Sequence, residues 1–162
     1  TMPGQGFGTA AGVLVAQNLG AGQPERAERS TWVTLGLTEA VKLIAALAAL
    51  VWAESLVSIF STDPGLVEIG SAFVRIGAAN YLLLGVATVI SQALNTAGDT
   101  LATLVIVLVG IWGLQLPLAY LLPRVTNLGI YGVRWAIVIA QGARLVAYIT
   151  YFRLGRWKRI KI

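Results

Sequence analysis

The 162-residue sequence contains no cysteine and no histidine. Their absence excludes disulfide bonds, thiol catalysis and the usual zinc sites, and it removes the side chain that most often carries protons near neutral pH. Charged residues are also scarce: they make up 12% of the chain, whereas a soluble domain carries about 25%. So few charges cannot cover a water-facing surface, and we therefore expect a membrane protein.

Apolar residues make up 57% of the chain and gather in long runs. About 20 helical residues cross the hydrocarbon core of a bilayer. The runs predict an all-α fold, a polytopic transmembrane helix bundle, with helices at about residues 4–17, 29–53, 64–95, 100–122 and 131–153. The last four are long enough to span, and the first is expected to be the second half of a spanning helix whose start is missing. Because the sequence opens almost inside this apolar run, we expect residues 1–162 to form the C-terminal lobe of a longer protein.

Local signals mark where these helices start and bend. Pro24 follows a glycine-rich turn, and Asp63-Pro64 precedes another apolar run, so each proline is expected at the first position of a helix, with Asp63 as a cap. Asp99 or Thr100 is expected to cap the helix that follows. Pro117 lies inside the predicted helix 100–122, where it is expected to cause a kink.

The basic residues are divided unevenly between the two ends of the predicted bundle. Four complete crossings place the turn at residues 17–27 and the tail at 153–162 on the same side. That side holds seven bases, namely Arg26, Arg29, Arg153, Arg156, Lys158, Arg159 and Lys161, against Arg124 and Arg134 on the other. Cytoplasmic loops carry the excess of Lys and Arg, so this side and the basic tail 153–162 are expected in the cytoplasm. The bases do not follow a face with stacking aromatics, so no nucleic-acid partner is expected.

Three stretches of sequence carry a family resemblance. They are Gln17-Asn18-Leu19-Gly20-Ala21-Gly22 with the following Pro24, Arg26 and Ala27; Phe60-Ser61-Thr62-Asp63-Pro64; and Gln92-Ala93-Leu94 with the following Gly98-Asp99-Thr100. They resemble connecting segments of the multidrug and toxic compound extrusion (MATE) family, although Thr96 stands where that family more often has glycine. The resemblance covers essentially the whole chain. It implies that the first turn joins the eighth and ninth helices of a two-lobe transporter, whose C-terminal half this chain would form.

The resemblance also implies an activity, a location and partners. The activity is secondary active multidrug efflux, in which inward flow of Na⁺ or H⁺ drives export of organic cations and other amphipathic compounds. The location is the plasma membrane, here the bacterial inner membrane, with the C-terminus in the cytoplasm. The implied partners are the lipid bilayer, the exported small molecules and the missing N-terminal lobe, and no cofactor or metal is implied.

The coupling residues of the family do not transfer to this chain. The resemblance places them on helices of the N-terminal lobe, or on the seventh and tenth helices. The candidate tenth helix, residues 69–94, contains no acidic residue. The residues that bind the coupling ion are therefore not identifiable here, and we expect the 162 residues not to transport by themselves.

Three charged residues lie near the middle of predicted spanning helices. Glu39 and Lys42 are three residues apart and share a helical face. A charge near the bilayer centre costs roughly 3 kcal/mol on insertion scales, so it needs a partner or water. The two residues either line a transport cavity or form an ion pair that only neutralises its own burial, and we favour the ion pair. Arg144 has no acid nearby in the sequence, so we expect it to pair with Glu39 across the bundle rather than to contact substrate.

Polar residues on two helices complete the set of candidates. Small and polar side chains form a stripe along helix 64–95, made of Gly77, Asn80, Leu84, Thr88, Ser91 and Asn95. The stripe is either a close-packing face or a wall of the cavity. We take Asn80 and Thr88, with Gln141 beside Arg144 on the last helix, as candidate cavity residues. Arg75, near a helix end, is expected to reach the membrane interface.

Other classes of membrane protein compete with this interpretation. A lipid-linked oligosaccharide flippase of the same superfamily needs a cationic cavity, which Arg144 and Lys42 would weakly allow. An integral-membrane enzyme is not expected, because the sequence offers no catalytic residues: it has no paired-aspartate metal motif and no nucleophile constellation. A non-transporting membrane subunit, or an inactive membrane fragment, stays open as a further alternative.

Overall fold

The computed structural model describes residues 2–126 and 129–159 of the chain. Its elements are α1 (Met2–Gly20), α2 (Pro24–Val51), α3 (Ala53–Ser58), α4 (Pro64–Thr96), α5 (Thr100–Leu108), the π-helix η1 (Val109–Gln115), α6 (Leu116–Val125), α7 (Ile130–Arg153) and the 3₁₀ turn η2 (Arg156–Arg159). No strand occurs in this described part, and the all-α expectation is confirmed. Lys161, one of the bases of the predicted tail, lies outside the described residues.

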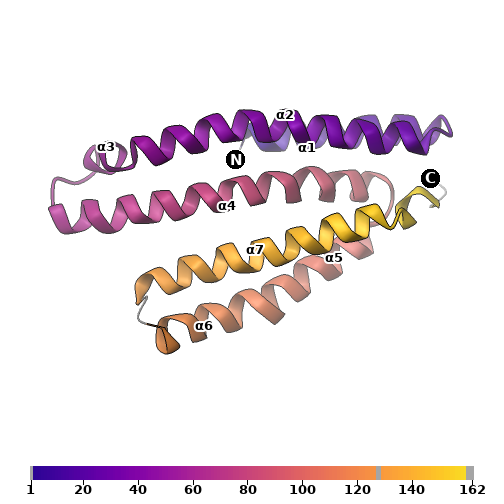
Figure 1. Cartoon of the computed structure of the whole chain (residues 1–162). Coiled ribbons are helices and arrows are strands. Elements are labelled where there is room, and N and C mark those ends of the chain that lie inside the picture. The colour runs from indigo at the N-terminus through magenta and orange to yellow at the C-terminus, as the bar shows by residue number, and fades with distance from the viewer. Residues whose placement is uncertain (1, 127–128, 160–162) are drawn as a thin grey trace.

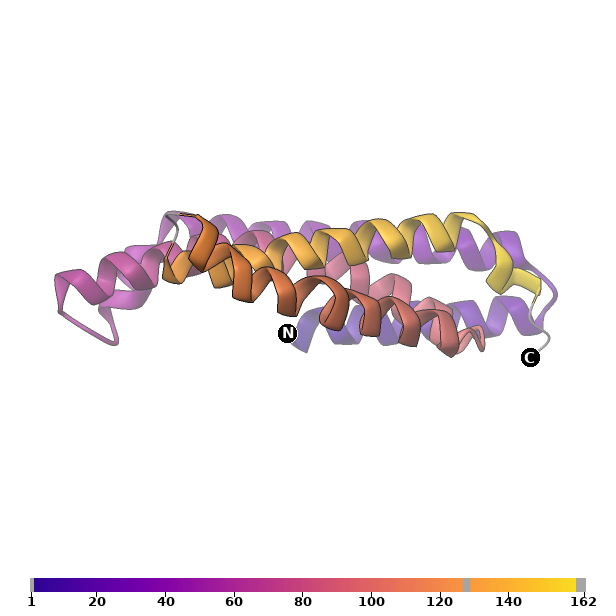
Figure 2. The ribbon, with the colours of Figure 1, turned by 90° about the horizontal axis from the view of Figure 1, so that it is seen from below.

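The helices form a bundle with α4 at its centre. α1 and α2 lie on one side of α4, and α7 with the continuous α5–η1–α6 helix lies on the other (Figure 1). The α1–α2 turn, the α4–α5 turn and η2 gather at one end, as the four predicted crossings require. The view from below shows the same long axis, with α1 beginning about halfway along the bundle (Figure 2).

In the described part of the chain, four helices are long and apolar enough to cross a membrane: Pro24–Val51, Pro64–Thr96, Thr100–Val125 and Ile130–Arg153. Their large apolar side chains point outward, as Ile44, Leu101 and Trp112 do, each at least 70% exposed. The inner faces are rich in alanine, which lets neighbouring helices approach closely. This distribution is that of a multi-pass membrane protein, and the predicted polytopic bundle is confirmed.

The three expected helix starts are confirmed, but the side-chain cap expected at the third is not formed. Pro24 and Pro64 stand in the first turns of α2 and α4, and the Asp63 carboxylate accepts hydrogen bonds from the backbone N–H of Gly65 (2.8 Å) and Leu66 (3.3 Å). Asp99 precedes α5, but its side chain makes no capping bond. Its carboxylate instead accepts a 2.7 Å hydrogen bond from the hydroxyl of Tyr151 on α7.

The predicted helix 29–53 differs from the structure at both ends. α2 already begins at Pro24, because this proline fits the first helical turn. It ends at Val51, and α3 begins beyond Trp52. The break lets Val57 of α3 pack against α4 at Gly70, where an added Cβ would stand 2.7 Å from a methyl of Val57.

The helix 100–122 is interrupted by a wide turn rather than by a simple kink. Within η1, the Leu116 N–H bonds to the carbonyl of Ile111, five residues earlier. Pro117 follows directly. In a regular α-helix its ring would clash with the carbonyl one turn before it, and a π-helical turn is one way to relieve that clash.

Candidate functional site

Glu39 and Lys42 lie on the face of α2 that meets α4. Lys42 is 3% exposed, and its ammonium donates a 3.0 Å hydrogen bond to the backbone carbonyl of Tyr81 and stands 4.2 Å from the centre of the Tyr81 ring. The Oε1 atom of half-buried Glu39 is buried and has no hydrogen-bond partner among the described residues. The two side chains do not form the expected ion pair, because the lysine is held by α4 instead.

Gly85 of α4 makes room for both of these side chains. An added Cβ at Gly85 would stand 2.7 Å from Cδ and 2.9 Å from Nζ of Lys42, and it would also collide with Oε1 of Glu39. Real Cβ atoms essentially never come so close, so the ends of the Glu39 and Lys42 side chains occupy the space that a Cβ at position 85 would need. The site therefore combines a buried ammonium, a carboxylate oxygen free to accept, and a glycine that lets the helices close around them.

The polar stripe of α4 divides into two parts. Thr88 packs against α1, since a Cβ at Gly8 would lie 3.2 Å from the Thr88 methyl, and its hydroxyl donates to the carbonyl of Leu84 (2.7 Å). This contact is that of a packing face. Asn80 lies further toward the middle of α4, and its side-chain oxygen is buried without a partner among the described residues.

Arg144 does not pair with Glu39, contrary to expectation. The helices that carry them, α2 and α7, lie on opposite sides of α4 (Figure 1). Arg144 instead donates a 3.1 Å hydrogen bond to the side chain of Gln115, and its aliphatic stem packs on Gly110 of η1. Gln141 is buried on the same helix, at 4% exposure. The arginine thus joins α7 to the π-helical turn.

The glycine-rich turns are built by their backbone. Gly22 and Gly98 have φ angles of 70° and 86°, a conformation that side-chain-bearing residues rarely adopt. In the first turn, the N–H of Gln23 bonds to the carbonyl of Asn18 (2.8 Å), and Arg26 donates to the side chain of Gln23 (2.9 Å). Gly20 and Gln17 belong to this turn as well, where the Ala21 N–H bonds to the Gln17 carbonyl.

The second turn is closed in the same way. The N–H of Asp99 bonds to the carbonyl of Leu94 (2.9 Å).

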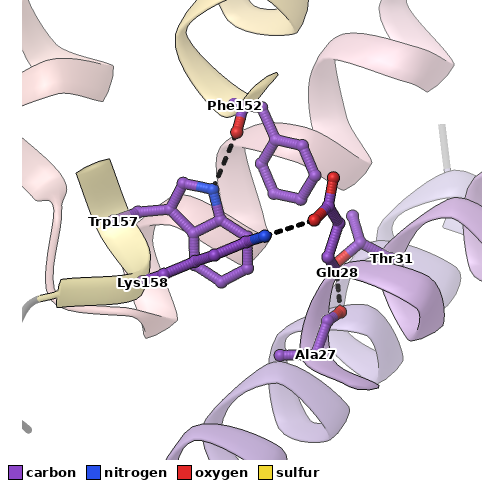
Figure 3. A network of polar contacts seen from close by, with 6 residues as sticks. All are labelled: Ala27, Glu28, Thr31, Phe152, Trp157 and Lys158. Atoms are coloured by element: carbon purple, nitrogen blue, oxygen red, sulfur yellow. Dashed lines mark hydrogen bonds and ion pairs between the residues drawn. The ribbon is translucent and has the colours of Figure 1, made fainter. Parts of the chain in front are cut away.

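A packed network that the sequence patterns did not predict lies at the same end of the bundle (Figure 3). Trp157 is fully buried and stacks on Phe152 with ring centres 4.8 Å apart, and its indole N–H donates to the Phe152 carbonyl (2.9 Å). The adjacent Lys158 forms an ion pair with Glu28 of α2. A lone tryptophan inside a basic tail was the available signal, because an indole there needs an apolar surface to cover it.

Arg75 also has a partner that its position did not suggest. It pairs with Glu54 of α3 at 2.9 Å, with both side chains about half or more exposed (49% and 68%). This ion pair ties α3 to α4 at the end of the bundle opposite the glycine turns. No group of three or more histidine, cysteine, aspartate or glutamate side chains gathers anywhere in residues 2–126 and 129–159 in a way that could hold a metal ion.

Four apolar spans around buried polar side chains define the class, a multi-pass helical membrane protein. Comparison with known proteins then gives the family: the MatE family model matches residues 1–121, and the chain belongs to this family. Members of the family are transporters, not enzymes.

Individual relatives agree with this assignment. The chain is 28% identical over 161 residues to the probable multidrug resistance protein YoeA of Bacillus subtilis, covering 99% of this chain and 35% of YoeA. It is 27% identical over 162 residues to the probable multidrug resistance protein NorM of Thermotoga maritima, covering 98% and 34%. The crystal structure of the eukaryotic MATE transporter AtDTX14 has the same fold, with a TM-score of 0.86 at 18% identity over 96% of this chain and 35% of that one. The chain thus spans about a third of the length of these relatives.

Proposed function

We propose that this chain is part of a secondary active multidrug efflux transporter, which exports organic cations and other amphipathic compounds in exchange for Na⁺ or H⁺. Its membership of the MatE family supports the proposal, as do the relatives from B. subtilis and T. maritima, both described as probable multidrug resistance proteins. The chain would form the C-terminal lobe, and a second lobe would complete the transport pathway.

The structural observation that carries the proposal is the unpartnered carboxylate oxygen of Glu39. Ionisable groups inside a spanning helix are costly, and they mark ion and substrate pathways in membrane proteins. Lys42 is already engaged by the Tyr81 carbonyl, so the glutamate keeps its capacity to accept a proton or a cation. Glu39 and Asn80 are the two polar residues of the set that we assign to the pathway.

The other candidates take supporting roles in this proposal. Thr88 packs α4 against α1, and Lys42 fixes α2 on α4. Arg144 holds the π-helical turn through Gln115, with Gln141 buried on the same helix. The turns around Gly22 and Gly98 would lie at the cytoplasmic surface of the bacterial inner membrane, together with the C-terminus, because the basic residues gather at this end.

Dye accumulation in cells tests the proposal. The full-length protein is expressed in a bacterial host without its own efflux pumps, and the steady-state uptake of ethidium is measured. We expect lower accumulation than in cells without the protein, and a return to the higher level when a protonophore and a sodium ionophore collapse both gradients. Two results together would instead assign the protein as a flippase. They are unchanged ethidium accumulation and restored growth of a host that lacks its own lipid-linked oligosaccharide flippase.

A further inference from the structure

A surface pocket of about 570 Å³ lies between the last turns of α1 and the first turns of α2. The turn between α1 and α2 is at the end of the bundle where the α4–α5 turn also lies (Figure 1). The polar residues that line the pocket are Gln17, Asn18, Gln23, Arg26, Arg29 and Ser30. The transport proposal makes no use of this pocket.

The pocket is lined by two arginines, Arg26 and Arg29. The described ion pairs are Arg75–Glu54 and Lys158–Glu28, so neither Arg26 nor Arg29 takes part in one. Glu28, which lies between the two arginines in the sequence, is engaged by Lys158 (Figure 3). No acidic residue lines the pocket.

Arg26 and Gln23 present hydrogen-bond donors to the pocket, whereas Asn18 uses its NH₂ group on the Leu14 carbonyl (2.7 Å) and presents its amide oxygen. Arg26 uses one N–H for the side-chain carbonyl of Gln23, and its remaining N–H groups stay available. Because the Gln23 oxygen is taken by this bond, its amide NH₂ group is the part it presents. Guanidinium groups with neighbouring amides match the oxygens of a phosphate, which accept several hydrogen bonds at once.

One large apolar side chain, that of Leu14, also lines the pocket, on the side toward the membrane interior. Leu14 lines the pocket at 40% exposure, and its neighbour Val13 is 49% exposed. Leu14 precedes the end of α1 by six residues, which places it about 9 Å along the helix axis from the turn. A ligand that fills this pocket therefore meets cationic groups at the bundle end and aliphatic side chains below them.

We propose that this pocket binds the phosphate of an anionic membrane lipid, with the acyl chains lying along Leu14 and Val13. Basic pockets between spanning helices are suited to anionic lipid headgroups, and the apolar flank favours a lipid over a free phosphate ion. The site holds the α1–α2 turn at the level of the lipid headgroups. This inference needs only that the chain spans a membrane, and it does not rest on the transported substrate.

Binding of a fluorescent phosphatidylglycerol to the detergent-solubilised full-length protein tests the proposal, with fluorescent phosphatidylcholine as the neutral probe. We expect tighter binding of phosphatidylglycerol than of phosphatidylcholine. The double variant Arg26→Gln/Arg29→Gln should bind it roughly 30-fold more weakly, the factor given by two direct hydrogen bonds to the phosphate worth about 1 kcal/mol each. The matched control is Arg153→Gln/Arg156→Gln, which removes two exposed charges at the same end but outside the pocket. It should lose less than about threefold, because distant surface charges are screened.

A second variant fills the pocket without changing its charge. Ala21 is an exposed lining residue, so Ala21→Trp should weaken phosphatidylglycerol binding while both arginines remain. Equal losses in the two double variants, or wild-type binding by Ala21→Trp, would show that diffuse charge rather than this pocket attracts the lipid. Displacement of the lipid by millimolar inorganic phosphate would overturn the lipid assignment in favour of a free phosphate.

Discussion

Lys158 and Glu28 form an ion pair although 130 positions separate them in the sequence. The pair joins η2, at the end of the described chain, to the first turns of α2. Trp157 stands beside Lys158 and is fully buried against Phe152. The segment after α7, expected as a basic tail, is thus in its first part a packed element of the bundle end.

Replacing Trp157 by alanine should destabilise the protein by about 3 kcal/mol, a typical loss for a fully buried tryptophan. Trp157→Phe keeps a ring against Phe152 but loses the indole hydrogen bond and part of the buried ring, so it should cost less, about 1–2 kcal/mol. Thermal unfolding of the full-length protein in detergent measures both. If Trp157→Ala unfolds at the wild-type temperature, η2 is not docked as described.

The Lys158–Glu28 pair should contribute much less. Its side chains are 26% and 31% exposed, and partly solvated ion pairs give up to about 1 kcal/mol. A double-mutant cycle with Lys158→Gln and Glu28→Gln should show a coupling free energy of this size, and raising the salt concentration should reduce it. Coupling well above this value would mean that the pair is more deeply buried than in the structure.

Gly85→Ala should displace the ends of the Glu39 and Lys42 side chains, because the new Cβ would overlap their positions. The displacement breaks the hydrogen bond from Lys42 to the Tyr81 carbonyl, so we expect a loss of about 1 kcal/mol. Gly77→Ala is the matched control on the same helix, because nothing lies within 4 Å of its added Cβ and alanine favours the helix. We expect a lower unfolding temperature for the first variant only. Equal behaviour of the two would contradict the close approach at Gly85.

Arg144 and Gln115 should act as one structural unit. Removing Gln115 alone, as Gln115→Leu, leaves the guanidinium without its side-chain partner and should be destabilising, whereas the double variant Arg144→Met/Gln115→Leu should recover much of the loss. Unfolding temperature and dye efflux are measured together. Complete loss of efflux in a double variant of wild-type stability would instead place Arg144 in the transport pathway.

The sequence predicted those parts of the fold that depend on local signals. Pro24 and Asp63-Pro64 marked helix starts correctly, because the first turn of a helix has its own preferences for proline and for a capping carboxylate. Hydropathy located the spans, since about 20 apolar residues are what a bilayer requires.

Side-chain partners were much harder to predict. Asp99 was expected to cap its own helix, but Tyr151, 52 positions away, supplies a donor that local sequence cannot reveal. Arg144 was expected to pair with Glu39, because opposite charges attract, yet α4 lies between their helices and Gln115 is within reach. Gly85 looked unremarkable in the sequence, and its importance comes entirely from the two side chains of α2 that lie against it.

Reconstitution of the full-length protein tests the central claim most directly. Proteoliposomes loaded with a cationic dye are given an inward H⁺ gradient, an inward Na⁺ gradient or neither, and dye release is followed for wild type and for Glu39→Gln. The account predicts release that depends on one of the two gradients and that slows in Glu39→Gln, with protein orientation and amount matched. Two results would contradict ion-coupled efflux. One is dye release at the same rate with and without either gradient, and the other is no release at all from vesicles that hold folded protein.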